Sequence, residues 1–404
     1  MGLRLGVVAT LGALAACNGR YEVGEGDGGE AGSLTETGGS GGGGQGGAGG
    51  GQGSAGGTGG SSTAGSDSSG GTGGTSTGAV GGAPSAGTGG SSIGGSTSTV
   101  CDFVPPDSLP DPAKASPEVV WRRISRFLYD EERQVDLVFP QETTHEWVTR
   151  VVSSLLDAHH EAGEGAPAGL AKFIRNWAFA GNETETAAEW AAPLVDPGAG
   201  FVTELFGPRA SDASRKSMLE DEAFLSAFPR PSYRGAWILR NLMCLEVGTP
   251  PIGTSDPAPA PGPSQTSRQA LEAYTSSEAA CVGCHRYIDP VGFSLENYDS
   301  SGAPREFDNG LPVDTSGTFN FDVYGDISFV DNAHLLSQIT PLCEVGACFS
   351  SALLDYAIDQ AYAGEGPEIL PVERQYVLAA LASEYHRLRP MVLAVVTTPA
   401  FLKE

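Results

Sequence analysis

Aromatic side chains are almost missing from the first 100 positions of this 404-residue chain, which contain Tyr21 but no Phe and no Trp. The same stretch holds 34 glycines between Gly24 and Gly95. Burial of apolar surface there could not offset the entropy lost on ordering the backbone. We therefore predict a disordered Gly/Ser/Thr-rich linker over residues 18–100, and we expect the foldable part of the chain to follow it.

Basic residues are also scarce, because 23 Lys and Arg stand against 49 Asp and Glu and give a net charge of −26. Only six of the acids lie in the first 100 residues, so the acidity belongs to the foldable part. Nucleic-acid binding needs positive side chains opposite the phosphates, so we expect no nucleic-acid partner. The same charge weighs against adhesion to anionic lipid headgroups.

Long apolar runs are missing as well, since no stretch of 18 apolar residues is present to form a transmembrane helix. A shorter apolar run at residues 5–13 follows Arg4, as in an export signal. Leu14-Ala15-Ala16-Cys17 comes next and resembles the bacterial lipobox, whose cysteine carries acyl chains such as palmitate. We predict a lipoprotein signal peptide and lipobox over residues 1–17 and lipidation of Cys17. An ordinary signal peptide with an incidental cysteine is the alternative.

This N-terminus predicts where the protein is located. Two or three acyl chains on one cysteine form a stable membrane anchor. We therefore expect an exported bacterial cell-envelope lipoprotein, at the outer membrane or the cell surface, which contacts the membrane through its N-terminal lipid.

The rest of the chain is predicted to be mostly α-helical, because apolar residues recur there at helical spacing and strand signals are few. Ser116-Pro117-Glu118 is typical of a helix start, and residues 143–146 form a capping box that begins a second helix. The Pro-rich residues 249–263 predict an extended connector. The best strand signal is at 318–323, and further helices are expected near 170–177, within 229–243, and at 267–274, 335–339, 350–362, 372–388 and 389–397.

One motif carries chemistry. Cys281-Val282-Gly283-Cys284-His285 has the C-x-x-C-H spacing of c-type haem attachment, in which two thiols bond the porphyrin and the adjacent His binds iron. A zinc site would need two more ligands, and a redox-active dithiol is expected between a strand and a helix, which the surrounding sequence does not suggest. We predict one covalent haem c held by Cys281, Cys284 and His285, with His285 as the proximal iron ligand. Zinc, a disulfide and unmodified thiols are the alternatives.

The groups around this motif are less clear from the sequence. The second ring nitrogen of His285 needs a hydrogen-bond acceptor, and we expect a backbone carbonyl near Asp289-Pro290 to provide it. The sixth iron position is either open or filled by one of five candidates, which are Met218, Met243, Met391, His334 and His386. Carboxylates after the motif are expected to cap and brace a loop, with a cation site or a catalytic pair as the alternative; they are Asp289, Glu296, Asp299, Asp308 and Asp314.

Four further cysteines are candidates for disulfides, namely Cys101, Cys244, Cys343 and Cys348. An even number in an exported chain predicts two disulfides, with three ways to connect them. Cys343–Cys348, with the spacing C-x4-C, is the local option.

The haem motif lies in a stretch, residues 281–299, that resembles the planctomycete-type cytochrome c domain. Residues 310–317 look like a downstream element of that domain, and residues 234–244 resemble its entry. Weaker likenesses to adjoining helical domains lie at 122–129, 173–177 and 349–401. Such proteins are surface lipoproteins of planctomycetes and of myxobacteria.

The resemblance implies haem and a surface location more firmly than it implies a reaction. It divides the chain into a helical domain at 101–228, a cytochrome c-like domain at 229–340 and a C-terminal helical domain at 341–404. The segment between Trp177 and Met218 is shorter than the family would have it, so the first domain looks truncated. Relatives carry cysteines at the positions of Cys244 and Cys348, so the resemblance implies that these two form a disulfide.

We therefore expect electron transfer with an unidentified redox partner protein, and an electron carrier rather than an enzyme. The alternatives are a haem oxidoreductase or peroxidase-like enzyme with an open distal site, and a surface binding module in which the haem motif is vestigial.

Overall fold

A computed structural model describes the chain at 109, 115–134, 139–141, 143–182, 185–207, 217–248, 260–277, 279–321, 325–383 and 386–404. The predicted signal peptide, the Gly-rich linker, Cys17, Cys101 and most of the Pro-rich connector lie outside the described residues. The described residues belong to one compact unit. The domain boundaries at 228/229 and 340/341 stay predictions.

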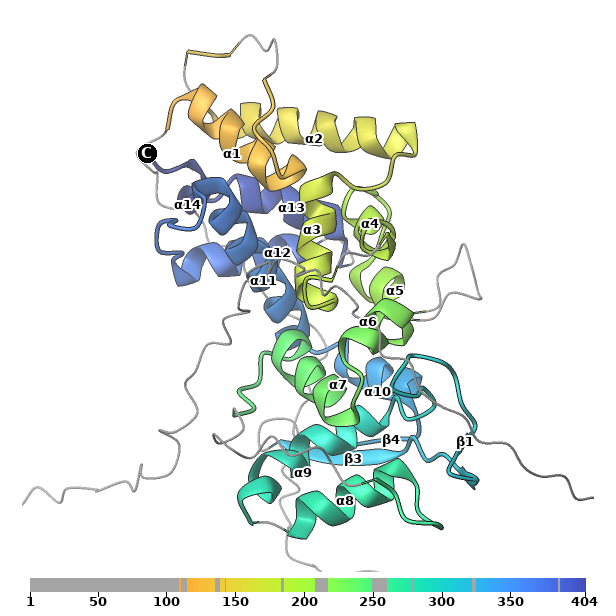
Figure 1. The fold of residues 1–404 in the computed structure, drawn as a ribbon. Helices are drawn as coiled ribbons and strands as arrows, with labels where there is room; N and C mark the ends of the chain where they lie inside the picture. Colours follow the sequence, from red (N-terminus) through yellow and green to blue (C-terminus); the bar gives the residue numbers. More distant parts are fainter. Residues whose placement is uncertain are drawn as a thin grey trace, which may run out of the picture. The chain divides into compact units, whose positions relative to one another are not determined.

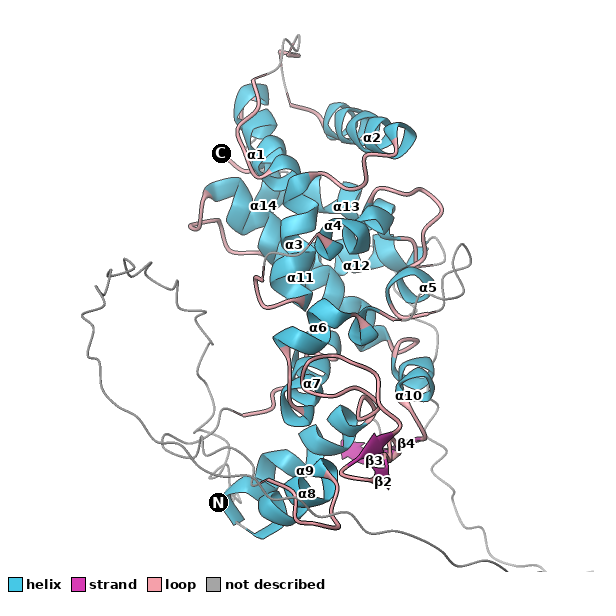
Figure 2. Ribbon diagram, turned by 45° about the vertical axis from the view of Figure 1, so that its right-hand side comes forward, coloured by secondary structure: helices cyan, strands magenta, loops and turns pink. Residues whose placement is uncertain are grey.

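The fold is mostly α-helical, as predicted, and Figures 1 and 2 show its helices and its few strands. The first helical group comprises α1 (Pro117–Tyr129), α2 (His145–Ala162), α3 (Ala168–Ala178), α4 (Thr186–Ala191), η1 (Ala192–Leu194) and α5 (Phe201–Leu205). Next come η2 (Met218–Glu220), α6 (Glu222–Ala227), α7 (Pro231–Trp237), the π-helical turn η3 (Ile238–Leu242), α8 (Ser267–Ser277) and α9 (Ala279–Phe293). Four strands, β1 (Phe307–Asp308), β2 (Leu311–Pro312), β3 (Gly317–Phe321) and β4 (Gly325–Phe329), precede α10 (Asn332–Ile339), α11 (Cys343–Tyr362), α12 (Pro371–Ser383), α13 (Leu388–Val396) and α14 (Pro399–Leu402).

The first two helices begin as their capping residues dictate. Ser116 caps α1, because its hydroxyl accepts a hydrogen bond from the Val119 N–H at 3.5 Å. The cap of α2 is Thr144, whose hydroxyl accepts from the Trp147 N–H at 3.1 Å. The predicted capping box, which placed the cap at Thr143, is therefore wrong by one residue. The Thr143 hydroxyl instead donates to the Ala115 carbonyl at 2.8 Å.

The C-terminal helices complete the core of the N-terminal helices. The Ala115 N–H donates to the Leu402 carbonyl at 3.0 Å, and the guanidinium of Arg123 donates to the Phe401 and Lys403 carbonyls. Figure 1 shows α11 beside α1 and α3, and α14 beside α1. The Phe349 ring of α11 packs edge-on against Trp177 of α3 at 4.8 Å between centroids. Segments more than 150 positions apart in the sequence thus share one apolar core.

A second group of elements holds the C-x-x-C-H motif. Helices α7 and α8 pack against α9, and the β3–β4 hairpin packs against α9 and α10 (Figures 1 and 2). The hairpin is antiparallel, with Phe319 opposite Ile327, and both side chains are buried. The predicted strand at 318–323 corresponds to β3, whereas no sequence pattern predicted β4 or α9.

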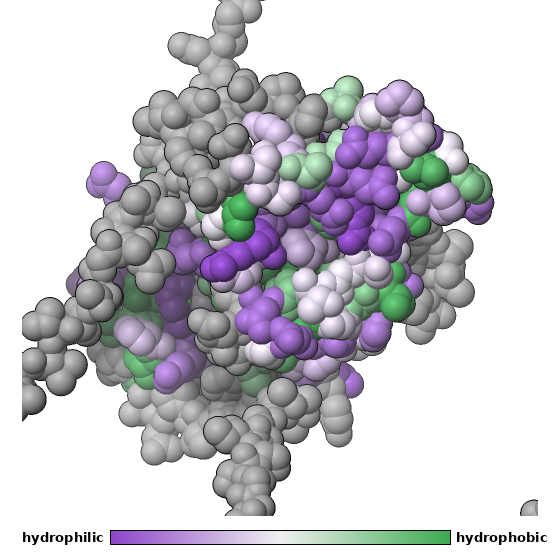
Figure 3. Space-filling model, turned by 90° about the horizontal axis from the view of Figure 1, so that it is seen from below, coloured by the Kyte–Doolittle hydropathy of each residue, from purple (hydrophilic) through white to green (hydrophobic). Residues whose placement is uncertain are grey.

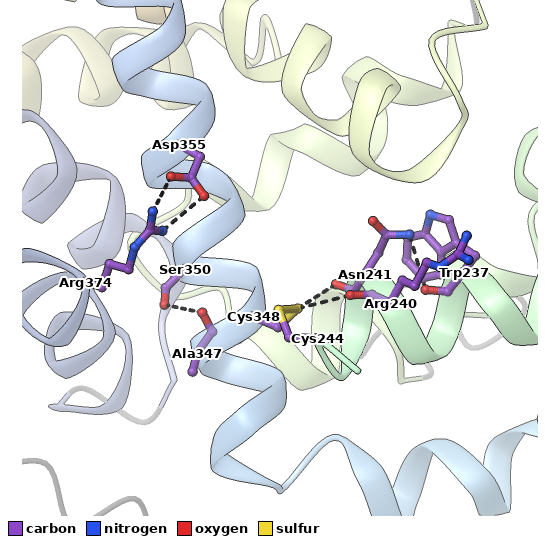
Figure 4. The surroundings of a disulfide bond; sticks show 9 residues. All are labelled: Trp237, Arg240, Asn241, Cys244, Ala347, Cys348, Ser350, Asp355 and Arg374. Atoms are coloured by element: carbon purple, nitrogen blue, oxygen red, sulfur yellow. Dashed lines mark hydrogen bonds and ion pairs between the residues drawn. A yellow bond between two sulfur atoms is a disulfide. The ribbon is translucent and has the colours of Figure 1, made fainter. Parts of the chain in front are cut away.

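A disulfide joins the two groups of elements. Cys244, just after η3, is bonded to Cys348 in α11 (Figure 4). This is the pairing that the family resemblance implied, and it excludes the local Cys343–Cys348 option. Cys343 is disulfide-bonded as well. Near this bond, the indole N–H of Trp237 donates to the Trp177 carbonyl at 2.9 Å, so α7 is fixed against α3 by a hydrogen bond as well.

Across the residues that the structure describes, no helix combines the length and the apolar character needed to cross a membrane.

Candidate functional site

The site is built on a close crossing of α7 and α9. A Cβ atom added to Gly235 in α7 would lie 1.9 Å from the Ile288 carbonyl oxygen, and one added to Gly292 in α9 would lie 1.9 Å from the Pro231 carbonyl oxygen. Only glycine permits backbones to approach so closely. The crossing brings Ser232, one turn before Gly235, against the middle of α9.

Replacing Gly235 with alanine should therefore destabilise the protein. The added methyl group meets backbone on the opposite helix, which cannot move aside as a flexible side chain would. We expect the free energy of unfolding to fall by about 1–3 kcal/mol. Urea unfolding of the full chain, produced without haem attachment, measures it.

Gly283→Ala is the matched control for this prediction. Gly283 lies in α9, and an added Cβ atom there meets no atom within 4 Å. Alanine there should leave stability unchanged or raise it by about 0.5–1 kcal/mol. Equal unfolding midpoints for Gly235→Ala and wild type would contradict the close crossing.

The C-x-x-C-H motif forms the first turns of α9. Cys281 and Cys284 are three positions apart on this helix and so project from the same side of it. Both sulfurs are outside disulfides and both side chains are partly exposed. Between them, Val282 is 37% exposed, a high value for a large apolar residue, and Gly283 faces open space. The motif thus presents two thiols and an apolar side chain at the surface.

The end of the molecule that carries α8 and α9 is seen in Figure 3. The described surface there is largely hydrophilic, with smaller apolar patches between the polar residues. An apolar ligand held at such a surface would depend on specific bonds from the protein.

His285 is oriented by a carboxylate. Its Nδ1 atom lies 2.9 Å from Oδ1 of Asp289, one helical turn further along α9. The sequence predicts a backbone carbonyl near Asp289-Pro290 as the acceptor. The acceptor is indeed at Asp289, but it is the side-chain carboxylate rather than a backbone carbonyl. The side chain of Asp289 turns toward the ring because i and i+4 positions share a helix face.

The Asp289 carboxylate is buried, with 3% of the residue exposed, and is held by three helices. The hydroxyl of Ser232, from α7, donates to its Oδ1 at 2.7 Å. The hydroxyl of Thr275, from α8, lies 3.3 Å from its Oδ2 and 3.0 Å from the Leu271 carbonyl. An ionised carboxylate has no hydrogen to donate, so the proton of the contact with His285 belongs to Nδ1. In the neutral ring, the lone pair on Nε2 is then left available to a metal.

A second buried charge cluster stabilises the loop after α9. Arg305 binds Glu296 at 2.7 Å and Asp308 at 3.0 Å. Burial raises the pKa of Glu296, and the positive charges of Arg305 and Arg234 oppose that rise. Desolvation therefore outweighs the ion pairs at this carboxyl group.

The side chain of Arg234, from α7, binds backbone carbonyl groups of the same loop. It is 1% exposed, and its guanidinium donates to the carbonyls of Phe228, Leu295, Tyr298 and Asp299 at 2.6–3.0 Å. Burial lowers its pKa to about 10, so the side chain is charged at neutral pH. One buried cation thus fixes the end of α9 and the chain that follows it.

Two other carboxylates stabilise turns, as the sequence predicted. Asp299 accepts hydrogen bonds from the N–H groups of Ser301 and Ala303, and Asp314 accepts from Ser316. The Ser301 and Ser316 contacts lower the pKa of Asp299 and Asp314, respectively. Of the five carboxylates after the motif, Asp289 is the one that contacts His285. In the described part of the chain, no group of three or more His, Cys, Asp and Glu side chains is arranged to hold a metal ion.

The five candidate distal ligands all make contacts within the folded protein. Met218, Met243 and Met391 are buried in the apolar core. The ring of His334 accepts the Val330 N–H, and the backbone carbonyl of His386 accepts the Phe201 N–H. The identity of a distal ligand stays a prediction.

Comparison with known proteins finds a family match for one part of the chain. Residues 215–308 match the family PSCyt3. Its description is "Protein of unknown function (DUF1588)", and it is a cytochrome c-associated domain family of planctomycetes. The match begins near η2 and includes α7, α8, α9 and the whole C-x-x-C-H motif. No curated protein and no solved structure matches the chain.

The PSCyt3 region contains Ser232, Thr275 and Asp289 as well as the motif. Sequence reasoning missed the first two, because a lone serine and a lone threonine carry no spacing signal. The one signal that pointed to Asp289 was its position four residues after His285.

Proposed function

We propose that this protein is a cell-envelope lipoprotein that binds one covalent haem c and transfers single electrons. The observation that carries the proposal is the arrangement on α9, where two thiols share one side of the helix and His285 keeps Nε2 available. The match of residues 215–308 to a cytochrome c-associated family supports it.

The residues present suit a covalently attached haem. Cys281 and Cys284 would each add their S–H across one vinyl group to form a thioether, and His285 would be the proximal ligand through Nε2. When bound, the haem supplies an iron centre that gains and loses one electron. The protein's part is to orient the His285 ring through Asp289 and to hold α9 in place through Gly235 and Arg234.

We also propose that the chain is exported and anchored through a lipid on Cys17. The lipobox and the short apolar run before it support this, as does the fact that c-type haem is attached outside the cytoplasm. The redox partner would be another protein, and the net charge of −26 disfavours nucleic acid. Detergent phase partitioning of the exported full chain is the test, since a Cys17→Ala variant that partitions like wild type would exclude the lipid anchor.

A second function, a haem oxidoreductase with an open distal site, is favoured by the contact between His285 and Asp289. A carboxylate acceptor makes the imidazole a more basic ligand, which suits higher oxidation states of iron. Carbon monoxide added to the reduced protein distinguishes the two functions. An unchanged absorption spectrum is expected for an electron carrier with both axial positions filled, whereas a shifted spectrum would establish the open site instead.

A further inference from the structure

The buried Asp289 carboxylate contacts side chains of three helices, which is more than the stabilisation of a single loop requires. Its contacts come from three different helices, through Ser232 of α7, Thr275 of α8 and His285 of α9. In the described part of the chain, the turn carboxylate of Asp299, by contrast, accepts its hydrogen bonds from Ser301 and Ala303 of its own loop. A buried carboxylate is costly unless its hydrogen bonds are made, so this placement constrains α7, α8 and α9 together.

We propose that Asp289 is a positioning residue that holds the reduction potential of the haem iron below the value a neutral acceptor would give. This inference rests on the proposed haem. A charged acceptor on Nδ1–H strengthens the hydrogen bond and increases the electron density that His285 donates through Nε2. A stronger donor stabilises ferric iron more than ferrous iron, so the potential falls.

The couple concerned involves one electron and no change in covalent bonds. One electron from a partner protein, or from a mediator dye in the titration, converts ferric to ferrous iron. The hydrogen bond between Nδ1 and Asp289 persists in both states and differs only in strength.

Asp289→Asn is the decisive variant. The amide oxygen keeps the shape and accepts the hydrogen bond, but the negative charge is lost. We expect the midpoint potential, measured by spectroelectrochemical titration of the full holoprotein, to rise above that of wild type. Asp299→Asn is the matched control, because it removes the same charge ten residues away without touching His285. We expect its shift to be much smaller.

Ser232→Ala tests the same idea in the opposite direction. Removing this donor concentrates the carboxylate's charge on the bond to His285, so the potential should fall below that of wild type. If Asp289→Asn attaches no haem, this variant alone decides between the outcomes. A potential unchanged in every haem-bearing variant, or equal shifts for Asp289→Asn and Asp299→Asn, would overturn the proposal.

A measurement without haem separates failure of this inference from failure of the proposed function. In the apoprotein, nitrogen-15 NMR of His285 should show the neutral ring protonated at Nδ1. Asp289→Asn should shift the tautomer mixture toward Nε2 protonation. An even mixture in wild type would refute the positioning role, even if no haem is attached. A chain that lacks covalent haem but keeps the Nδ1 tautomer would refute the proposed function and leave the positioning contact standing.

Discussion

Replacing both Cys281 and Cys284 with alanine should abolish covalent haem in the exported protein. Each thiol forms one thioether, so the double variant has no atom left with which to bond the porphyrin. Each single variant keeps at most one thioether and should carry less haem than wild type. Denaturing electrophoresis with haem-peroxidase staining measures this, after export in cells that contain the haem-attachment machinery.

Gly283→Ala is the control for this experiment, because it changes the residue between the thiols without altering their spacing. It should stain like wild type, since the added methyl group meets no atom within 4 Å. Staining of the double cysteine variant equal to wild type would exclude thioether attachment at this motif and favour the zinc or disulfide alternatives.

Replacing Arg234 with methionine should cost more stability than any other single substitution considered above. Methionine fills a similar volume but removes the Arg234 donor from four carbonyl groups, one before α7 and three after α9. The Leu295 and Asp299 carbonyls keep a backbone N–H as donor, so among the described residues the Phe228 and Tyr298 carbonyls are the two left without one. We expect the free energy of unfolding to fall by about 2–6 kcal/mol, since each of the two buried unsatisfied carbonyls costs about 1–3 kcal/mol. Arg234→Lys should recover little, because an ammonium group cannot reproduce the planar fork of donors.

Arg230→Met is the matched control for the Arg234 prediction. Arg230 precedes α7 by one residue, is exposed, and lies over the Tyr233 ring at 5.7 Å. Its loss should change stability by less than about 0.5 kcal/mol. Urea unfolding of the full chain compares the two variants, and equal midpoints would show that the buried guanidinium does not hold the loop.

Local signals predicted the helical class and several of its elements. Ser116 followed by Pro117 located the start of α1, and the periodic apolar residues of α3 and α11 are buried in the structure. The predicted capping box is wrong by one residue because Thr143 and Thr144 are adjacent and have the same side chain. The hydrogen bond from Thr143 to the distant Ala115 carbonyl, which sequence alone does not reveal, distinguishes them. The resemblance to a known family, rather than spacing, singled out the Cys244–Cys348 disulfide.

The C-x-x-C-H motif was recognisable in the sequence, whereas the residues that surround it in the fold were not. Pro290 and Gly292 lower the helix propensity of the segment that forms α9, and packing against α7 overrides that preference. Ser232 lies 57 positions before Asp289, so no local pattern could connect them. The choice of a carboxylate over a carbonyl as the partner of His285 depends on that long-range contact.

We propose that one haem is bonded to this chain through two thioethers. The decisive experiment is intact-mass spectrometry of the denatured full-length protein, combined with its pyridine haemochrome spectrum. We expect a mass increase of one haem and an α-band at the position of a porphyrin with both vinyl groups saturated. A chain exported beside an active haem-attachment system that shows no added haem mass would contradict it.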